Sequence, residues 1–131
     1  MVGQGPDAIM EVLLVTSRET KRWVIPKGNI GFSSSPHAAA AEEAEEEAGV
    51  QGAIVPKPLG TFRYRKRVRS GLSVTAKVVV FPLLVSRELD DWKEMHERRR
   101  RWFTVAEAVN AVEEPGLRDL IRAFGAKGWG Q

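Results

Sequence analysis

The sequence predicts an α/β protein in which a mixed β-sheet is sandwiched between helices (α/β/α). Short apolar runs bounded by Gly, Pro and polar residues are typical of strands, and they alternate with segments whose apolar residues recur at helical spacing. The alternation lacks the regularity of repeated βαβ units, which favours a mixed sheet over a parallel one. With 131 residues, 43% hydrophobic and 28% charged, the chain fits a single globular domain over residues 1–131.

The first half of the chain predicts a hairpin followed by a helix. Residues 10–16 (MEVLLVT) read as a strand, and residues 22–26 (RWVIP) read as a returning strand that ends at its proline. Ser35 is a suitable N-cap because its hydroxyl can accept from a free backbone N–H of the first turn. Pro36 fits the first helical position, which predicts a helix from Pro36 to Ala48. Gly49 suits the left-handed residue that follows a helix.

The middle of the chain predicts two long strands. Residues 59–65 (LGTFRYR) and residues 72–85 (LSVTAKVVVFPLLV) are joined by a turn at Ser70 and Gly71. Pro82 cannot donate a backbone hydrogen bond, so it predicts an edge position or a bulge within the second strand. The segment before Met10 is short and is not expected to supply a full strand of its own.

The last third predicts a short strand and two helices. Residues 100–103 (RRWF) read as the strand, and residues 104–112 as a helix that Thr104 and Glu107 begin with a capping box. Residues 115–124 place apolar side chains at helical spacing. Trp23 and Trp102 lie in strand patterns, where core packing is expected.

The composition excludes several classes of protein. The chain has no cysteine, so disulfides and thiolate metal sites are excluded. Its two histidines give little material for a histidine metal cluster, and His37 and His96 are expected at the surface. The longest apolar runs are much shorter than a membrane span, and the N-terminus lacks the features of a signal peptide. We therefore expect a cytoplasmic protein without a membrane partner, either a monomer or a homodimer.

The predicted central helix has two distinct faces. Glu43, Glu46 and Glu47 fall on one face because residues three and four apart are neighbours on a helix. Ala41, Ala44 and Ala48 form a face of small side chains that can approach a sheet closely. The three carboxylates repel one another unless a cation lies between them, and Mg²⁺ prefers such oxygen ligands. A solvated acidic surface explains the same pattern, and the helix alone does not decide between the two.

The sequence GNIGFSSSPHAAAAEEAEEEAGV, residues 28–50, resembles the Nudix box. That pattern is Gly, five residues, Glu, seven residues, then Arg-Glu-apolar-x-Glu-Glu-x-Gly-apolar. Residues 11–28 and 100–109 resemble the branch of the Nudix hydrolase family that acts on diphosphoinositol polyphosphates and diadenosine polyphosphates. The box positions that match are Gly28, Glu43, Ala44, Glu46, Glu47, Gly49 and Val50.

The resemblance implies a Nudix fold and a Mg²⁺-dependent pyrophosphohydrolase that cleaves a phosphoanhydride bond, with Mn²⁺ as a possible substitute. Glu43, Glu46 and Glu47 are the implied metal ligands, and Glu43 and Glu46 are the implied catalytic residues. The expected partner is a small polyphosphate substrate, either diadenosine polyphosphate or diphosphoinositol polyphosphate. An additional carboxylate outside the box could come from Glu88, Asp90, Asp91, Glu94 or Glu97.

Two positions depart from the box. Ser34 replaces its first glutamate, and Glu42 replaces the arginine that orients a box glutamate in the family. Glu42 is four residues before Glu46, so an attractive pair has become a repulsive one. Three outcomes stay open: weakened metal binding, a misplaced Glu46, or tolerance because Glu42 turns outward or another arginine substitutes. A catalytically impaired module that binds polyphosphate is therefore the alternative function.

Basic residues are the expected phosphate ligands. Lys27 and Gly28 are near the substrate phosphates by resemblance, and Arg22 flanks the same strand. If residues 62–69 are extended, arginines at alternate positions point to one side; of these, Arg63 and Arg65 are the expected phosphate contacts. A solvated edge strand explains these arginines equally well. Within Arg98–Arg101, alternation lets only half of the side chains face one site.

Net charge is +3 and the sequence pI is near 9.5, which raises RNA-end hydrolysis as a third function. Nucleic acid is not expected as a partner, because only one of the two basic runs contains a tyrosine that could stack on a base.

Overall fold

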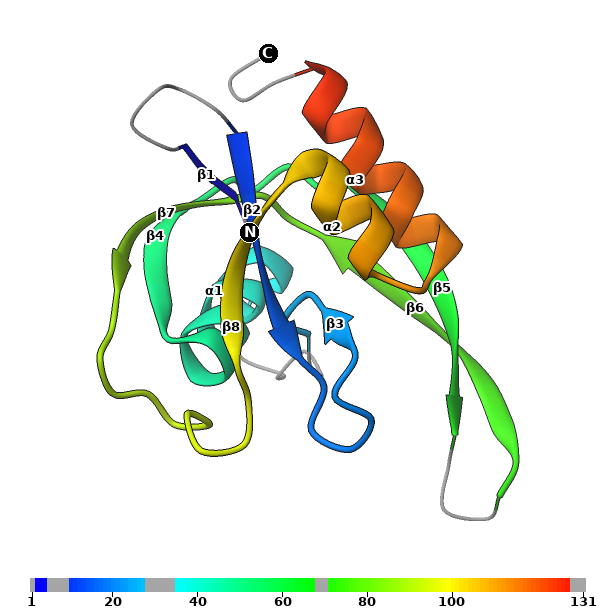
Figure 1. The fold of residues 1–131 in the computed structure, drawn as a ribbon. Coiled ribbons are helices and arrows are strands. Elements are labelled where there is room, and N and C mark those ends of the chain that lie inside the picture. Colours follow the sequence, from blue (N-terminus) through cyan, green and yellow to red (C-terminus); the bar gives the residue numbers. More distant parts are fainter. Residues whose placement is uncertain (1, 5–9, 28–34, 68–70, 128–131) are drawn as a thin grey trace.

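The computed structural model describes residues 2–4, 10–27, 35–67 and 71–127 (Figure 1). Strands and helices follow one another as the sequence predicts, and the C-terminal part is helical. The strands are β1 (Val2–Gln4), β2 (Met10–Thr16), β3 (Trp23–Val24), β4 (Val50–Ile54), β5 (Gly60–Arg67), β6 (Ser73–Val80), β7 (Leu83–Glu88) and β8 (Arg100–Thr104). The helices are α1 (Pro36–Ala48), α2 (Val105–Ala111) and α3 (Pro115–Lys127).

The main sheet has six strands in the order β3-β2-β1-β7-β4, with β8 paired to the other edge of β2. Only β1 and β7 pair in parallel, and the other strand pairs of this sheet are antiparallel. The predicted hairpin is confirmed by the antiparallel β2–β3 pair, although β3 contains only two residues. The N-terminal strand is short, as expected, and it still links β2 to β7. The sheet is therefore mixed, as the sequence predicts.

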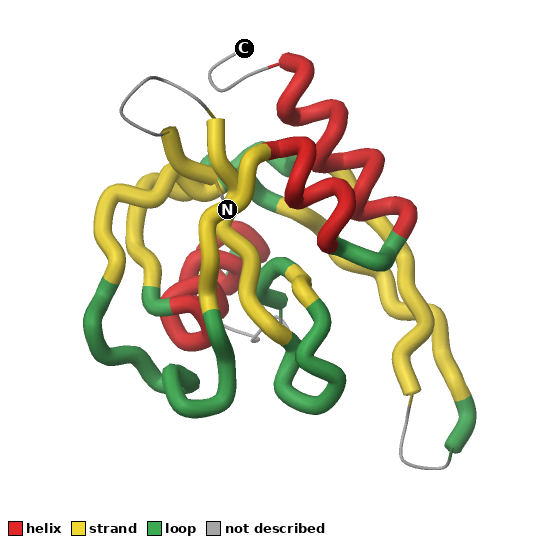
Figure 2. The backbone as a smooth tube through the Cα atoms, viewed as in Figure 1, coloured by secondary structure: helices red, strands yellow, loops and turns green. Residues whose placement is uncertain are grey.

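Both faces of β2 are buried, which explains its continuous apolar run. Val12 and Leu14 belong to a core with α2 and α3, while Leu13 and Val15 belong to a core with α1. Successive side chains of a strand point to opposite faces, so one strand contributes to two cores. Figure 2 shows α1 apart from the α2–α3 pair, with strands of the main sheet between them. This is the predicted three-layer α/β/α arrangement.

A second sheet is formed by the antiparallel pair β5–β6, in register from the Gly60–Val80 pair to the Arg67–Ser73 pair. The hairpin projects from the body of the molecule beside α3 (Figure 1). Phe62 joins the core between β2 and the last two helices, and a Cβ added at Gly116 of α3 would lie 2.6 Å from the Phe62 Cβ. This close contact fixes the hairpin against α3.

Two strand predictions are corrected. Residues 72–85 do not form one strand: β6 ends at Val80, β7 begins at Leu83, and the two belong to different sheets. Pro82 lies at this transition, where it needs no N–H, and its carbonyl accepts from Val55 N at 2.9 Å. β4 was not predicted from the sequence, because a glycine interrupts its pattern. That residue, Gly52, lies at a register shift in the pairing with β7.

The ends of α1 and α2 are confirmed. Ser35 accepts from Ala38 N at the start of α1, Pro36 occupies the first turn, and Gly49 adopts φ +64° after its end. Thr104 and Glu107 form the predicted capping box of α2. Within the described parts of the chain, no helix is both long enough and apolar enough to cross a membrane.

Candidate functional site

A cleft of about 400 Å³ lies beside α1 and is bordered by the end of β3 and by β6. Its acidic side consists of Glu43 and Glu47, and its apolar lining includes Ala39, Ala40 and Ala44 of the same helix. The helix turns this acidic side toward the cleft because Ala44 and Ala48 are buried against the sheet. The cationic residues of the lining are Arg18, Lys27, Lys66, Lys77 and Arg98.

Glu47 is the buried carboxylate of the site, with 3% of its surface exposed. Its Oε1 accepts a hydrogen bond from Lys27 N at 3.3 Å and lies 3.4 Å from Arg98 Nη2. Burial and the hydrogen bond to the Glu43 side chain raise the pKa of Glu47 to about 8, against the lowering effect of Arg98 and of the Lys27 backbone. In the metal-free protein, Glu47 therefore keeps its proton at neutral pH.

Glu46 is more exposed than Glu47 and is not among the residues that line the cleft. Its side chain is 42% exposed and its Oε1 lies 3.7 Å from Lys93 Nζ. Within the described residues, no group of three acidic or histidine side chains is already arranged to hold a metal ion. The neighbouring Glu43 and Glu47 side chains nevertheless fit a divalent cation, because a cation that displaces the proton of Glu47 would give both side chains a partner. Glu46 lies on the same helix face, and its ion pair with Lys93 is exposed. Glu46 can leave that pair at little cost and join Glu43 and Glu47 as a metal ligand.

Lys27 and Tyr64 also line the cleft. The Lys27 ammonium lies 5.0 Å from the centre of the Tyr64 ring, a cation–π contact. Burial lowers the pKa of Lys27, while the charges of Glu114 and Glu47 oppose that shift. Burial also raises the pKa of the Tyr64 hydroxyl, and the charge of Glu114 adds to this effect. Lys27 is thus a partly desolvated cation facing the carboxylates.

The predicted phosphate ligands are only partly brought together. Arg22 is outside the cleft lining, where its Nη1 lies 3.4 Å from Glu113 Oε1. Arg63 and Arg65 are exposed and are not among the lining residues, so their role as phosphate contacts stays a prediction. Strand alternation places them on one side of β5, whereas Tyr64 and Lys66, on the other side, line the cleft. Gly28, like Ser34, lies outside the described residues.

Two lysines of the cleft were missed by the sequence reasoning. Lys66 follows Tyr64 by two residues on β5, so strand alternation places both on the same face. Lys77 comes from β6 and also lines the cleft. Strand alternation could have predicted the position of Lys66. Phe62 is the apolar residue of the strand and is expected to face inward, and Lys66, four residues later, lies on the same side.

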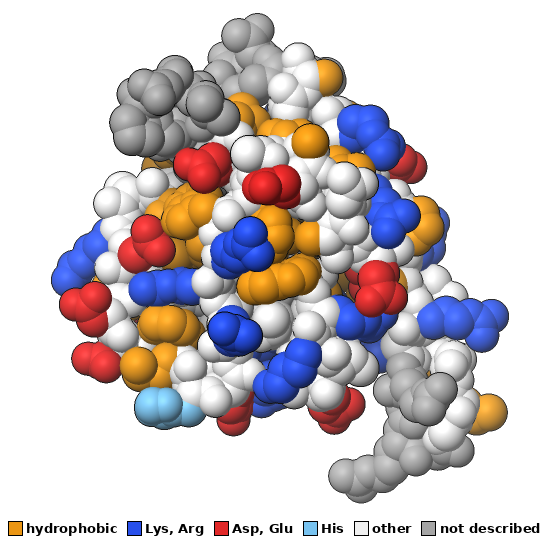
Figure 3. All heavy atoms as spheres, viewed as in Figure 1, with side chains coloured by type: hydrophobic (Ala, Val, Ile, Leu, Met, Phe, Trp, Pro, Cys, Tyr) orange, Lys and Arg blue, Asp and Glu red, His pale blue; other side chains and the backbone are white. Residues whose placement is uncertain are grey.

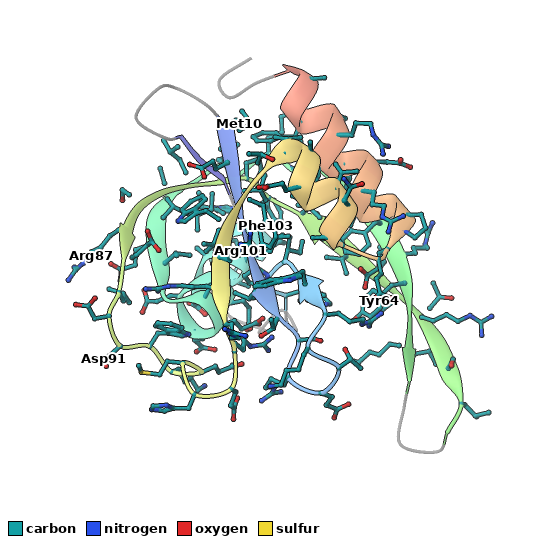
Figure 4. The ribbon with its side chains drawn as sticks, viewed as in Figure 1. Met10, Tyr64, Arg87, Asp91, Arg101 and Phe103 are labelled. Atoms are coloured by element: carbon teal, nitrogen blue, oxygen red, sulfur yellow. The ribbon has the colours of Figure 1, made fainter. Side chains whose placement is uncertain are left out.

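The basic run at residues 98–101 divides as predicted. Arg98 and Arg100 are partly buried, while Arg99 and Arg101 are exposed. Arg101 lies over the Phe103 ring at 4.9 Å, and Figure 4 shows both side chains on β8. Of these four arginines, only Arg98 lines the cleft.

The predictions for aromatic and histidine residues are largely confirmed. Trp23 and Trp102 each pack partly buried against a core cluster. His96 is exposed, whereas His37 is half-buried, with its ring 6.2 Å from that of Phe81. Neither histidine lines the cleft.

The five candidate carboxylates outside the box do not line the cleft. Glu94 is linked to the cleft through Arg98. Its Oε1 accepts a hydrogen bond from Arg98 Nε at 2.7 Å, and Arg98 also contacts Glu47. Glu88 pairs with Arg100 and Glu97 pairs with Arg18. A direct metal contact by any of the five therefore stays a prediction.

A three-layer α/β/α fold with a carboxylate-bearing helix beside a cationic cleft defines a Nudix-type protein. The NUDIX domain model matches residues 4–124, and the chain therefore belongs to the Nudix family.

Curated relatives agree with this assignment. The chain is 40% identical over 118 residues to Nudix hydrolase 12, mitochondrial, from Arabidopsis thaliana, a match that covers 88% of this chain and 58% of the relative. It is 35% identical over 106 residues to diphosphoinositol polyphosphate phosphohydrolase 2 from Rattus norvegicus, covering 79% of this chain and 55% of that protein. The chain thus spans somewhat more than half the length of these relatives.

Solved structures support the fold. A C. elegans Ap4A hydrolase binary complex superposes with a TM-score of 0.69 at 19% identity, covering 96% of this chain and 90% of that one. The NUDIX domain of Shewanella oneidensis NrtR complexed with ADP ribose superposes with a TM-score of 0.64 at 20% identity, covering 93% and 82%.

Proposed function

We propose that the chain is a divalent-metal-dependent pyrophosphohydrolase that cleaves a phosphoanhydride bond of a small polyphosphate. The observation that carries this proposal is the cleft in which the Glu43–Glu47 pair faces the cationic wall that includes Lys27. Such a site suits a substrate that brings several negative charges together with a divalent cation. Family membership supports the hydrolytic class of reaction.

Each residue of the site has a proposed role. Glu43, Glu46 and Glu47 hold Mg²⁺, or Mn²⁺ in its place, and Glu43 or Glu46 accepts a proton from the attacking water. Lys27 binds a phosphate oxygen as a compact positive charge. The bound metal supplies charge neutralisation on the phosphates and promotes ionisation of water. The Lys27 backbone N–H keeps the Glu47 carboxylate directed at the cleft.

The proposed substrates are diadenosine polyphosphates and diphosphoinositol polyphosphates. One relative is named for hydrolysis of diphosphoinositol polyphosphate, and one structural neighbour is named for hydrolysis of Ap4A. These similarities support both substrate classes as proposals. The cationic lining suits the phosphates of either, and Tyr64 and Phe81 offer aromatic surface in the same cleft.

RNA-end hydrolysis is less favoured. On the face shown in Figure 3, Lys and Arg side chains are interspersed with acidic ones and do not form a continuous basic track. Several relatives are named as mitochondrial or chloroplastic, and the cytoplasmic location of this chain remains a prediction, as does its state as a monomer or homodimer.

The test is Mg²⁺-dependent hydrolysis of diadenosine tetra- and pentaphosphate, a diphosphoinositol polyphosphate, nucleotide sugars and a triphosphorylated RNA. Glu46→Gln removes a ligand charge and keeps the side-chain size, so we expect it to abolish turnover and to leave the melting temperature nearly unchanged. Glu45→Gln is the matched control, because Glu45 is exposed on the same helix and bonds Gln51. Equal turnover by Glu46→Gln and the parent would refute the assignment.

No turnover on any substrate, combined with tight binding of one, would instead support the impaired polyphosphate-binding module. A steep dependence of RNA binding on salt and RNA length would support the third function.

A further inference from the structure

The carboxylate of Glu47 meets a guanidinium that comes from outside its own helix. Arg98 Nη2 lies 3.4 Å from Glu47 Oε1, and the two side chains are 10% and 4% exposed. A contact this well shielded from water holds its geometry far better than an exposed contact does. The contact joins α1 to the 89–99 loop, which connects β7 to β8.

Arg98 is itself held in three directions. Its Nε donates to Glu94 Oε1 at 2.7 Å, its Nη1 donates to Thr16 O at 3.1 Å, and its Nη2 faces Glu47. The planar guanidinium carries its donors in a rigid fork, so the first two contacts determine where the third donor points. Glu94 and the end of β2 thus fix the place at which Arg98 holds Glu47.

The other cations of this region make different contacts. Lys93 pairs with Glu46 at 3.7 Å, but its side chain is 69% exposed, so water competes for that pair. Arg100 donates to the backbone carbonyls of Ala48, Gly49 and Leu89 and to no carboxylate of the cleft. Arg98 is therefore distinguished from its neighbours by a buried contact with a proposed ligand.

Glu42 gives this contact its significance. It is exposed on α1 and is an acid, so it cannot supply an attractive partner to the glutamates of its own helix. We propose that Arg98, supported by Glu94, is a positioning residue that orients Glu47 for metal binding. This inference rests on the proposed function for its metal ligands, and it adds a residue from the distant 89–99 loop to the site.

The test measures Mn²⁺ binding to the full, substrate-free chain by electron paramagnetic resonance, together with kcat and KM on the best substrate. Arg98→Met keeps the length of the side chain and removes its donors. We expect Mn²⁺ binding to weaken by about 10-fold or more and kcat to fall, because loss of a residue that orients a ligand has effects of this order. KM for the substrate should change little.

Two further variants separate positioning from charge and from folding. Arg98→Lys keeps the charge but cannot donate in three fixed directions, so we expect it to recover only part of the Mn²⁺ affinity. Glu94→Gln leaves the Arg98–Glu47 contact in place and weakens its support, so a smaller loss in the same direction is expected. Glu94→Gln also keeps the test open if Arg98→Met fails to fold.

Arg100→Met is the matched control, since Arg100 is also partly buried but contacts backbone carbonyls and Glu88 instead of a box glutamate. It should lower the melting temperature and weaken Mn²⁺ binding much less than Arg98→Met does, because it removes no contact with a carboxylate of the cleft. Unchanged or tighter Mn²⁺ binding in Arg98→Met, full recovery in Arg98→Lys, or a parent that binds no Mn²⁺ would each overturn the inference. If the parent binds Mn²⁺ but hydrolyses no substrate, only the proposed function is overturned. Comparison of Mn²⁺ binding by the parent and by the Arg98 variants then still tests the role of Arg98.

Discussion

At the scale of single residues, Glu47 links the chemistry of the site to the stability of the protein. A carboxyl with 3% exposure, next to a second carboxyl, keeps its proton to unusually high pH. Its pKa in the folded, metal-free protein is about 8, against 4.5 for an ordinary glutamate. Binding of a divalent cation near neutral pH must therefore displace that proton.

We predict that the stability of the metal-free protein falls as pH rises. Between the ordinary pKa and about 8, the folded protein holds a proton on Glu47 that the unfolded chain has released. The free energy of unfolding therefore decreases through this window and levels off above it. The measurement is the melting temperature in the presence of a chelator, from about pH 5 to about pH 8.5.

Glu47→Gln should lose this contribution, and Glu45→Gln should keep it, since Glu45 is exposed on the same helix. Added Mg²⁺ should stabilise the parent more at the upper end of the range, where less proton has to be displaced. Parallel pH profiles for the parent and Glu47→Gln would contradict the assignment of the raised pKa.

At the scale of elements, the 89–99 loop completes the C-terminal end of α1. The last carbonyls of a helix have no partner within it, and here the loop and its continuation supply the donors. Glu94 N donates to Glu46 O at 3.0 Å, and Trp92 Nε1 donates to Glu47 O at 3.1 Å. Leu89 N reaches Gly49 O at 2.7 Å. The loop therefore fixes the same turn that carries Glu46 and Glu47.

This packing makes Gly49 a sensitive position. Its φ of +64° disfavours any L side chain, and an added Cβ would lie 2.6 Å from Trp92 Cδ2 and 2.8 Å from Arg100 Nη1. Gly71 also has a positive φ, +85°, but its Cβ would meet no described atom within 4 Å.

We predict that Gly71→Ala lowers the free energy of unfolding by about 1–2 kcal/mol, the cost of the left-handed conformation alone. Gly49→Ala should cost clearly more, because the Trp92 and Arg100 side chains must also move. Urea denaturation of both variants measures the difference, and equal losses would show that the loop yields easily. Gly49→Ala should also weaken Mn²⁺ binding, since the displaced loop holds Glu47.

Elements with strong local signals could be predicted, and those that depend on the tertiary structure could not. The bounds of α1 follow from Ser35, Pro36 and Gly49, whose effects are local. The break between β6 and β7 follows from a change of sheet, so Pro82 indicated an irregularity without showing that the strand ends there. β4 contains Gly52, and a Cβ added there would lie 1.9 Å from Leu84 O. The need for glycine at this position comes from the partner strand β7, so the local sequence could not reveal it.

At the scale of the whole molecule, the cleft collects positive charge from distant parts of the chain. Lys27 follows the short strand β3, Lys66 and Lys77 come from the β5–β6 hairpin, and Arg98 comes from the 89–99 loop. The hairpin belongs to a separate sheet, so its position against the body determines how closely its two lysines approach the carboxylates of α1.

We predict that Lys66→Gln and Lys77→Gln raise KM for a polyphosphate substrate and leave kcat nearly unchanged, because they remove binding charge remote from the reacting bond. Arg63→Gln and Arg65→Gln are the controls, since these exposed arginines of the same hairpin are outside the cleft lining. Steady-state kinetics at constant ionic strength measures the four variants. A larger effect from the arginine variants would restore the interpretation based on the sequence alone.

The acidic half of the site was predictable because helical spacing alone places Glu43, Glu46 and Glu47 on one face. The basic half was not, since the contributions of Lys66, Lys77 and Arg98 depend on how the hairpin and the 89–99 loop fold back onto α1. Arg98 belonged to a basic run of four arginines, and strand alternation could say only that half of them share a side.

The contact between Arg98 and Glu47 also bears on how this domain can diverge. Because Arg98 of the 89–99 loop supplies a cation to the site, an arginine at position 42 is no longer required. Other residues, including an acid such as Glu42, are then tolerated there. Across related chains, the loss of arginine at position 42 should then coincide with arginine at position 98. Relatives that lack arginine at both position 42 and position 98 should have lost hydrolytic activity. A comparison of the box residues alone would not distinguish them from relatives that keep arginine at position 98.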